Sequence, residues 1–289
     1  MLVSVWFADW LILHAAEKQL KPRTVESYKD LIDRYVVPLI GSIEIGALSP
    51  LDIRHMLAAV IAQGKGRTAE LLYTMLKCAF SELDSNPMLK VKRPKHVQKS
   101  PDPWNDAEMA IYTDALQNHK HGLALSLAII LGLRRGEICG LRWKDIDFEA
   151  QELHVVNQRV TLANGETIDC SPKSAASDRR IPLPPLLLSV LQARRGLPEC
   201  YLCSLSPSGL DQAHRALVER LGLRYIPLHG LRHSMATSCI RHGGQMRGLQ
   251  SILGHSTYAV TANKYTHVDH SILLSAVDAA AKPCYTVLQ

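Results

Sequence analysis

The sequence predicts a mainly α-helical protein with a small antiparallel β-sheet, arranged in two domains. Three observations support this fold class. Apolar residues recur at helical spacing through residues 1–86. Residues 87–103 combine prolines with basic side chains, as linkers do. Strand-like segments cluster between residues 152 and 183, where Asn164-Gly165 is the strongest short hairpin signal. The predicted second domain therefore covers residues 104–289.

The first domain is predicted to contain four helices. Residues 4–20 form the first, because their apolar side chains fall near helical spacing. The second should begin with Thr24 as its N-cap and stop at Val37-Pro38. Ser49-Pro50 opens the third, with the serine as N-cap and the proline in the first turn. Residues 68–83 form the fourth helix.

The second domain is predicted to place helices around a three-stranded antiparallel sheet. The strands are residues 152–163, 166–170 and 178–183. The helices are residues 104–119, 122–131, 136–141, 184–195, 209–221, 231–242, 246–253, 257–264 and 270–281. The apolar run from Gly122 to Leu133 is too short to cross a bilayer, so no membrane association is expected. The amphipathic C-terminal stretch could pack on its own domain or on a neighbouring protomer.

The composition is that of an ordinary globular protein from a reducing compartment. Hydrophobic residues make up 47% and charged residues 21% of the chain. A formal net charge of +6 is compatible with nucleic-acid binding without requiring it. Seven cysteines, an odd number at irregular spacing, favour the cytoplasm over a disulfide scaffold. The Cys200-x-x-Cys203 pair lacks the second pair that a zinc site needs, so no metal is expected there.

Separated motifs bring together cationic side chains and a phenol. Gly-Leu-Arg ends at Arg134, and a lysine lies in the loop after a predicted strand. In His229-Gly-Leu-Arg232-His233, the first histidine and the arginine share one helix face, a turn apart. Leu-Gly-His follows, and then Asn-Lys-Tyr-Thr-His. The candidate site residues are Arg134, Lys173, His229, Arg232, His255 and Tyr265.

This set of side chains suits cleavage of a phosphodiester without a metal. The reaction needs neutralisation of the non-bridging oxygens, a nucleophile and protonation of the leaving oxygen. An arginine fork donates paired hydrogen bonds and stays charged, and a lysine of lowered pKa can supply the proton. A phenol, with an ordinary pKa of about 10, becomes reactive when cations or a base surround it. Each residue alone would be read as an ordinary surface or core side chain.

These motifs resemble those of the tyrosine recombinases, the phage-integrase family. The resemblance runs from about residue 104 to about residue 270, and a weaker one covers residues 4 to 95. It implies a helical core-binding domain that clamps DNA, followed by an α+β catalytic domain. It selects Arg134 over its neighbour Arg135 as the functional arginine, with Glu137 as its partner.

The resemblance also implies a role for each remaining residue. Lys173 would protonate the leaving 5′ oxygen, and His229 would help to remove the proton of the nucleophile. His255 would be a second hydrogen-bond donor to the phosphate. Tyr265 would be the nucleophile rather than Tyr258, because it is followed by Thr-His. A metal held by His229 and His233 is disfavoured, since the motif lacks the glutamate of HExxH.

The function so implied is site-specific recombination or integration of DNA by a phage or mobile-element enzyme. Strands would be broken and rejoined through a 3′-phosphotyrosine, without metal, ATP or other cofactor. The implied partners are double-stranded DNA with specific sites, further copies of the chain in a homotetramer, and accessory DNA-bending or directionality factors. We also expect phosphate contacts from the basic residues of the linker, which are Lys90, Lys92, Arg93, Lys95 and Lys99.

Three alternatives stay open on the sequence alone. One is a type IB topoisomerase-like enzyme, which shares the chemistry without pairing two sites. Another is a DNA-binding regulator with a decayed site, although all six site positions are filled. The third is a metal-dependent nuclease. Many phage integrases have an arm-binding domain ahead of the core-binding helices, whereas helices begin here almost at Met1. The chain is therefore of the simpler two-domain kind or is a fragment.

Overall fold

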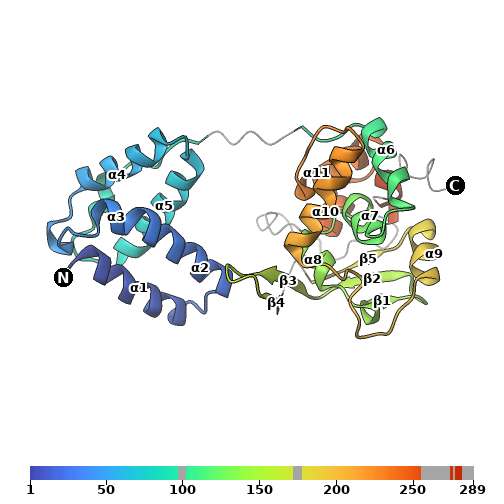
Figure 1. The fold of residues 1–289 in the computed structure, drawn as a ribbon, viewed down its shortest axis with the longest axis horizontal. Coiled ribbons are helices and arrows are strands. Elements are labelled where there is room, and N and C mark those ends of the chain that lie inside the picture. Colours follow the sequence, from blue (N-terminus) through green and yellow to red (C-terminus); the bar gives the residue numbers. More distant parts are fainter. Residues whose placement is uncertain (97–101, 172–177, 255–273, 276, 282–289) are drawn as a thin grey trace. The chain divides into compact units, whose positions relative to one another are not determined.

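The computed structural model describes residues 1–96, 102–171, 178–254, 274–275 and 277–281. The chain divides into two compact units, Met1–Ser100 and Pro101–Gln289. Both are mainly helical, and the strands that the structure describes form small antiparallel sheets (Figure 1). The fold class predicted from the sequence is confirmed.

Helices make up the regular structure of the first unit over its described residues. Their bounds are α1 Val3–Glu17, α2 Pro22–Leu31, a π-helical turn Ile32–Val36, α3 Val37–Ile40, a 3-10 turn Ile45–Ala47, α4 Pro50–Ala62, α5 Gly66–Ala79 and 3-10 turns Phe80–Glu82 and Pro87–Lys90. Ser49 caps α4 as predicted: its hydroxyl accepts from the amide of Asp52, whose carboxylate accepts from the amide of Ser49.

The second predicted helix differs from the structure at both ends. Lys21 is the N-cap and Pro22 the first residue of α2, so Thr24 lies inside the helix. The chain does not stop at Val37-Pro38 but continues through the π-helical turn into α3. In that turn the amide of Val37 donates to the carbonyl of Ile32. The wider turn brings Pro38 into the first turn of α3, where its missing N–H is tolerated.

The segment predicted as a linker begins inside the core of the first unit. Met88 and Val91 are buried together with Phe7, Leu72 and Phe80. The structured part of the first unit therefore extends past residue 86, through the 3-10 turn Pro87–Lys90 to Val91.

Over its described residues, the second unit contains helices and two antiparallel sheets. The helices are α6 Asp106–Leu116, α7 Gly122–Ile130, α8 Arg135–Gly140, a 3-10 turn Trp143–Asp145, α9 Pro185–Ala193, α10 Pro207–Arg220, α11 Leu228–Arg241 and α12 Met246–Leu253. The strands are β1 Ile146–Asp147, β2 Glu152–Val155, β3 Gln158–Thr161, β4 Thr167–Cys170 and β5 Arg179–Pro182. One sheet has the order β1-β2-β5, and the other pairs β3 with β4.

The strand predicted over residues 152–163 is two strands in different sheets. β2 pairs with β1 and β5, whereas β3 leaves that sheet, pairs with β4 and lies on α8. Two glycines of α8 allow this close approach. A Cβ at Gly136 would lie 2.8 Å from the carbonyl oxygen of Arg159, and one at Gly140 would lie 2.9 Å from the Cα of Gln158. The predicted hairpin turn is present, with Gly165 at φ +85°.

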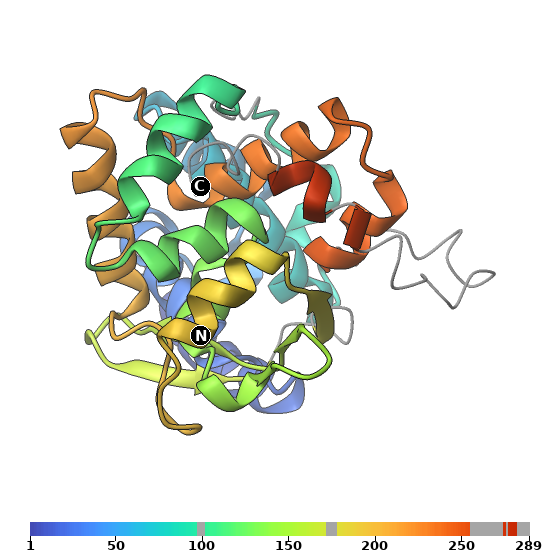
Figure 2. The ribbon, with the colours of Figure 1, turned by 90° about the vertical axis from the view of Figure 1, so that its right-hand side faces the viewer.

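Helix α7 lies at the centre of the second unit. Most of its side chains are buried, which is why the sequence shows no polar face. It packs against α6, α8 and α11, and Figure 2 shows the surrounding helices. Val277 and Ala279–Ala281 are buried in the same core, so this part of the C-terminal stretch packs on its own domain. Across the described residues, no helix is long and apolar enough to cross a membrane.

Candidate active site

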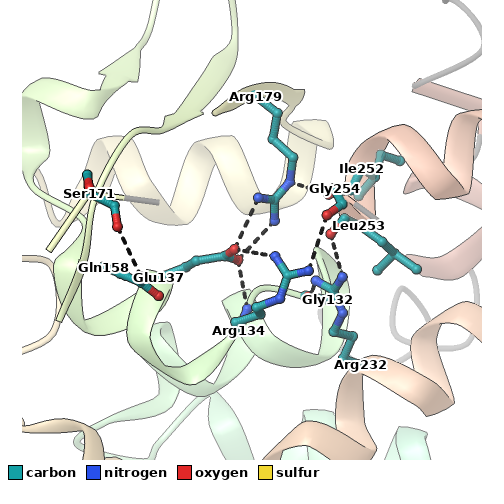
Figure 3. A network of polar contacts seen from close by, with 10 residues as sticks. All are labelled: Gly132, Arg134, Glu137, Gln158, Ser171, Arg179, Arg232, Ile252, Leu253 and Gly254. Atoms are coloured by element: carbon teal, nitrogen blue, oxygen red, sulfur yellow. Dashed lines mark hydrogen bonds and ion pairs between the residues drawn. The ribbon is translucent and has the colours of Figure 1, made fainter. Parts of the chain in front are cut away.

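Arg134 stands directly before α8 and is held by that helix. Its Nη1 donates to Oε1 of Glu137 at 2.7 Å, and its backbone amide donates to Oε2 of the same carboxylate at 2.9 Å (Figure 3). Its Nη2 donates to the carbonyl of Gly254 at 3.2 Å. The structure thus contains the pairing of Arg134 with Glu137 that the sequence predicts. Arg135 points elsewhere and pairs with Asp211.

Arg232 comes from α11 and is 3% exposed. Its Nη1 donates to the carbonyl of Gly132 at 2.6 Å, and its Nη2 donates to the carbonyl of Leu253. Burial, followed by the charge of Arg134, lowers the pKa of Arg232 to about 9. The guanidinium therefore keeps its charge at neutral pH. Both arginines are fixed by backbone carbonyls at the end of α12 (Figure 3).

Glycine is favoured at both turns that supply these carbonyls, because each has a positive φ. Gly132 has φ +62°, and a Cβ there would lie 2.3 Å from Cε of Met235. Gly254 ends α12 in the left-handed conformation at φ 59°. The glycines of the Gly-Leu-Arg and Leu-Gly-His motifs therefore shape the backbone that holds Arg134 and Arg232.

Glu137 is the anion of the cluster and is 4% exposed. Burial is the strongest single influence on its pKa and would raise it. The hydrogen bonds and charges of Arg179 and Arg134 together outweigh burial, so the pKa lies below the ordinary glutamate value. Glu137 is therefore an ionised carboxylate at neutral pH. The stability that this ionisation contributes is present above the ordinary glutamate pKa and is lost as pH falls through the lowered one.

Arg179 belongs to this cluster and was not singled out from the sequence. It lies at the start of β5, is 8% exposed and forms a paired contact with Glu137. One signal in the sequence could have found it. Strand residues of one face alternate, and Arg179 is in phase with the buried Ile181 and Leu183. An arginine on the inner face of a strand needs a buried partner.

His229 occupies the first turn of α11, which begins three residues earlier than the sequence predicted. Its side chain is partly exposed. Partial burial, then the charges of Arg232, Arg134 and His233, lower its pKa below the ordinary histidine value. The imidazole is therefore neutral at neutral pH and can accept a proton. Of the six predicted catalytic residues, the structure brings together Arg134, Arg232 and His229.

The other three predicted catalytic residues, Lys173, His255 and Tyr265, lie outside the described residues. Lys99 of the linker also lies outside them. The chain on either side of the lysine loop is held: Gln158 Nε2 donates to the carbonyl of Ser171 at 3.0 Å, and β5 begins at Arg179 (Figure 3). The predicted DNA-binding residues Lys90, Lys92 and Lys95 are exposed in the first unit, and Arg93 pairs with Glu70 at 2.8 Å.

Family models match both parts of the chain. The model of the phage integrase family covers residues 105–271. A model described as the phage integrase N-terminal SAM-like domain covers residues 4–59. The first match spans more than half of the chain and includes all six predicted catalytic positions.

Known proteins of similar sequence and fold agree with these matches. Tyrosine recombinase XerC of Alcanivorax borkumensis is 29% identical over 284 residues, covering 92% of this chain and 90% of that protein. A structure of the Tn1549 transposon integrase with transposon right end DNA has a TM-score of 0.75 at 21% identity, covering 94% of this chain and 97% of that one. A lambda integrase tetramer bound to a Holliday junction has a TM-score of 0.68 at 19% identity, covering 89% and 78%.

The fold and the matches define the class as enzymes that transfer DNA strands. Within that class, the chain belongs to the phage integrase family, the tyrosine recombinases. It is therefore a site-specific recombinase, and the topoisomerase-like and decayed-regulator alternatives are not favoured.

Proposed function

We propose that this recombinase breaks and rejoins DNA strands through a 3′-phosphotyrosine on Tyr265. The observation that carries the proposal is the paired Arg134 and Arg232, fixed side by side at the end of α12, the helix that leads into His255. Two fixed guanidinium groups are suited to the two non-bridging oxygens of one phosphate. Each carries more N–H donors than its carbonyl contacts use.

The reaction has two steps, cleavage of one strand by Tyr265 and rejoining by a 5′-hydroxyl. The phenol oxygen of Tyr265 attacks phosphorus, His229 accepts the phenol proton, and the bond to the 5′ oxygen breaks. Lys173 protonates the departing oxygen, which becomes a free 5′-hydroxyl. A 5′-hydroxyl of the partner strand then attacks the phosphotyrosine and gives its proton to Lys173, while the phenol oxygen leaves and takes its proton back from His229. One phosphoester bond replaces another in each step, so the chemistry consumes no ATP.

DNA trapping tests this function directly. The substrate is a duplex nicked close to the scissile phosphate. After cleavage, the short fragment that carries the new 5′-hydroxyl diffuses away and cannot rejoin, so the covalent adduct accumulates. We expect adduct at the 3′ end with the same yield in buffer and in saturating EDTA. An adduct that disappears with EDTA and returns with magnesium would contradict the phosphotyrosine mechanism.

His229 gives the reaction a defined pH dependence. Its pKa is lowered, so the imidazole stays neutral and able to accept a proton below the ordinary value of 6.5. The rate of adduct formation should therefore be level from pH 8 down to 6.5 and fall only below it. His229→Gln should be slower by a factor on the order of 10² and lack this acid limb.

The exposed His233, one turn further along α11, supplies the control. His233→Gln should keep an acid limb. If His229→Gln retained the limb of the parent protein, the proton would be accepted elsewhere.

Synapsis and partners are part of the proposal. Recombination joins two DNA sites, and each site contributes two cleaved strands, so four active sites are needed; we propose that a homotetramer on double-stranded DNA supplies them. The lambda integrase neighbour is a tetramer on a Holliday junction, which supports this assembly. Accessory DNA-bending or directionality factors, and a cytoplasmic location on nucleoid DNA, remain predictions.

The basic segment after residue 86 is proposed to bind DNA phosphates. In Lys92→Ala/Arg93→Ala/Lys95→Ala, affinity should fall similarly for all DNA sequences. The slope of log affinity against log salt should drop by roughly 0.9 for each phosphate that is no longer neutralised, because neutralising a phosphate releases counterions. The control is Lys144→Ala, whose ammonium pairs with Glu199. An unchanged slope in the triple variant would show that the segment is only solvated.

A further inference from the structure

Arg179 makes a second connection between Glu137 and the end of α12, the two parts of the protein that hold Arg134. Its Nη1 and Nη2 donate to the two oxygens of Glu137 at 3.1 and 2.9 Å. Its Nε donates to the carbonyl of Ile252 in the last turn of α12. Arg134 makes the matching connection, since it donates to Glu137 and to the carbonyl of Gly254 (Figure 3). Both arginines therefore link the carboxylate of α8 to the end of α12.

The two arginines together saturate the carboxylate. Glu137 accepts from the Arg134 amide, from Arg134 Nη1 and from both Nη atoms of Arg179. A carboxylate has room for about four such donors, so its orientation has little freedom left. Because the carboxylate of Glu137 has little freedom to turn, the guanidinium of Arg134 that pairs with it is restrained as well.

Stability alone is a weak explanation for this arrangement. Replacing a buried ion pair by apolar side chains of the same volume is often neutral or even stabilising, whereas its paired hydrogen bonds restrict the geometry of both side chains. Arg179 fixes a residue whose side chain is 34% exposed and can therefore be reached by a phosphate. A fixed donor matters most where charge must be stabilised in a transition state.

We propose that Arg179 is a positioning residue for phosphate binding. It fixes the position of Glu137 relative to the end of α12, so that Arg134 faces the scissile phosphate. This inference rests on the proposed function. Arg179 does not touch the phosphate in this mechanism; it acts through Glu137 and Arg134.

Lysine cannot replace Arg179 in this role. A lysine ammonium is a single point of charge and cannot donate as a fork to Glu137 while a separate nitrogen reaches Ile252. The neighbouring Arg180 provides a matched control. Strand alternation turns it to the other face of β5, where its side chain is 55% exposed and lies 3.7 Å from Glu152.

The test compares two substrates for each variant. One is the nicked duplex with an ordinary scissile phosphate. The other carries a methylphosphonate there, which lacks the negative charge that Arg134 would neutralise. Arg179→Lys should form adduct more slowly on the phosphodiester by a factor on the order of 10 to 10², as a misplaced group does. On the methylphosphonate it should react nearly as fast as the parent, and Arg180→Lys should match the parent on both.

Reduced folding cannot imitate this pattern. A smaller folded fraction lowers both rates by the same factor, so the ratio between substrates is unchanged. Arg179→Gln, which keeps one donor group, provides a second variant with the same expected ratio. Equal losses on the two substrates, or no loss at all, would overturn the inference.

A double variant separates this inference from the proposed function. If Arg179 acts through Arg134, Arg179→Lys should add no further loss in an Arg134→Ala background. Losses that multiply would overturn the inference alone. If Arg134→Ala itself reacts as fast as the parent, the phosphate-binding role in the proposed function fails, and the inference fails with it.

Discussion

Tyr265→Phe is expected to bind its DNA site about as well as the parent and to form no covalent adduct. Only one oxygen is removed, so the affinity should change by less than about 1 kcal/mol. The phenol is the proposed nucleophile, and its oxygen forms the bond to phosphorus. Loss of adduct should therefore be complete on the nicked duplex that traps the parent.

Tyr258→Phe is the matched control for that variant. Both tyrosines lie outside the described residues, and the sequence places Tyr258 seven positions earlier in the same segment. Tyr258→Phe should form adduct at the rate of the parent. An adduct from Tyr265→Phe, or none from Tyr258→Phe, would assign the nucleophile to another residue.

Arg232→Ala is expected to lower the rate of adduct formation by a factor on the order of 10² or more, as loss of an oxyanion donor does. The variant also leaves the carbonyls of Gly132 and Leu253 without this donor. Each unsatisfied buried group costs about 1–3 kcal/mol, so the melting temperature should fall as well. Rates should therefore be measured well below that melting temperature, with the folded fraction determined in parallel.

Arg241→Ala on the same helix separates the two effects. Arg241 is 46% exposed and pairs with Asp106 at 3.0 Å, away from the arginine pair. Its replacement should leave the rate unchanged. If the loss in Arg232→Ala were no greater than the loss of folded protein, Arg232 would hold the fold without acting on the phosphate.

Local patterns in the sequence predicted a large part of this site. The Gly-Leu-Arg motif selected Arg134, and Glu137, three positions later, was expected to pair with it, as it does in the structure. The same spacing linked His229 to Arg232. Helix α12 has the bounds that its apolar periodicity predicted.

Contacts between distant segments could not be predicted in this way. Arg232 is held by Gly132, 100 positions away, and Arg179 reaches Ile252, 73 positions away. In both contacts the acceptor is a backbone carbonyl, which every residue carries, so no residue type in the sequence identifies the acceptor. Their places depend on how α11, α12 and β5 pack, which no local pattern specifies.

Two errors of secondary structure have local causes. Pro38 indicated the end of a helix, but the π-helical turn before it removed the need for its N–H. Most of residues 152–163 are compatible with a strand, and Asn157, a residue type depleted in strands, lies in the break between β2 and β3, but propensity alone could not show that the chain changes sheet there. The glycines of α8 that admit β3 lie well upstream of it, at positions 136 and 140.

The central claim is a covalent bond between Tyr265 and the 3′ phosphate of the cleaved strand. Its most direct test is to trap the parent protein on the nicked duplex in EDTA, digest the adduct and locate the nucleotide by mass spectrometry. We expect the cleaved strand on the peptide that contains Tyr265, attached through its phenol oxygen. A nucleotide on any other residue, or cleavage that leaves no protein-linked DNA, would contradict the account.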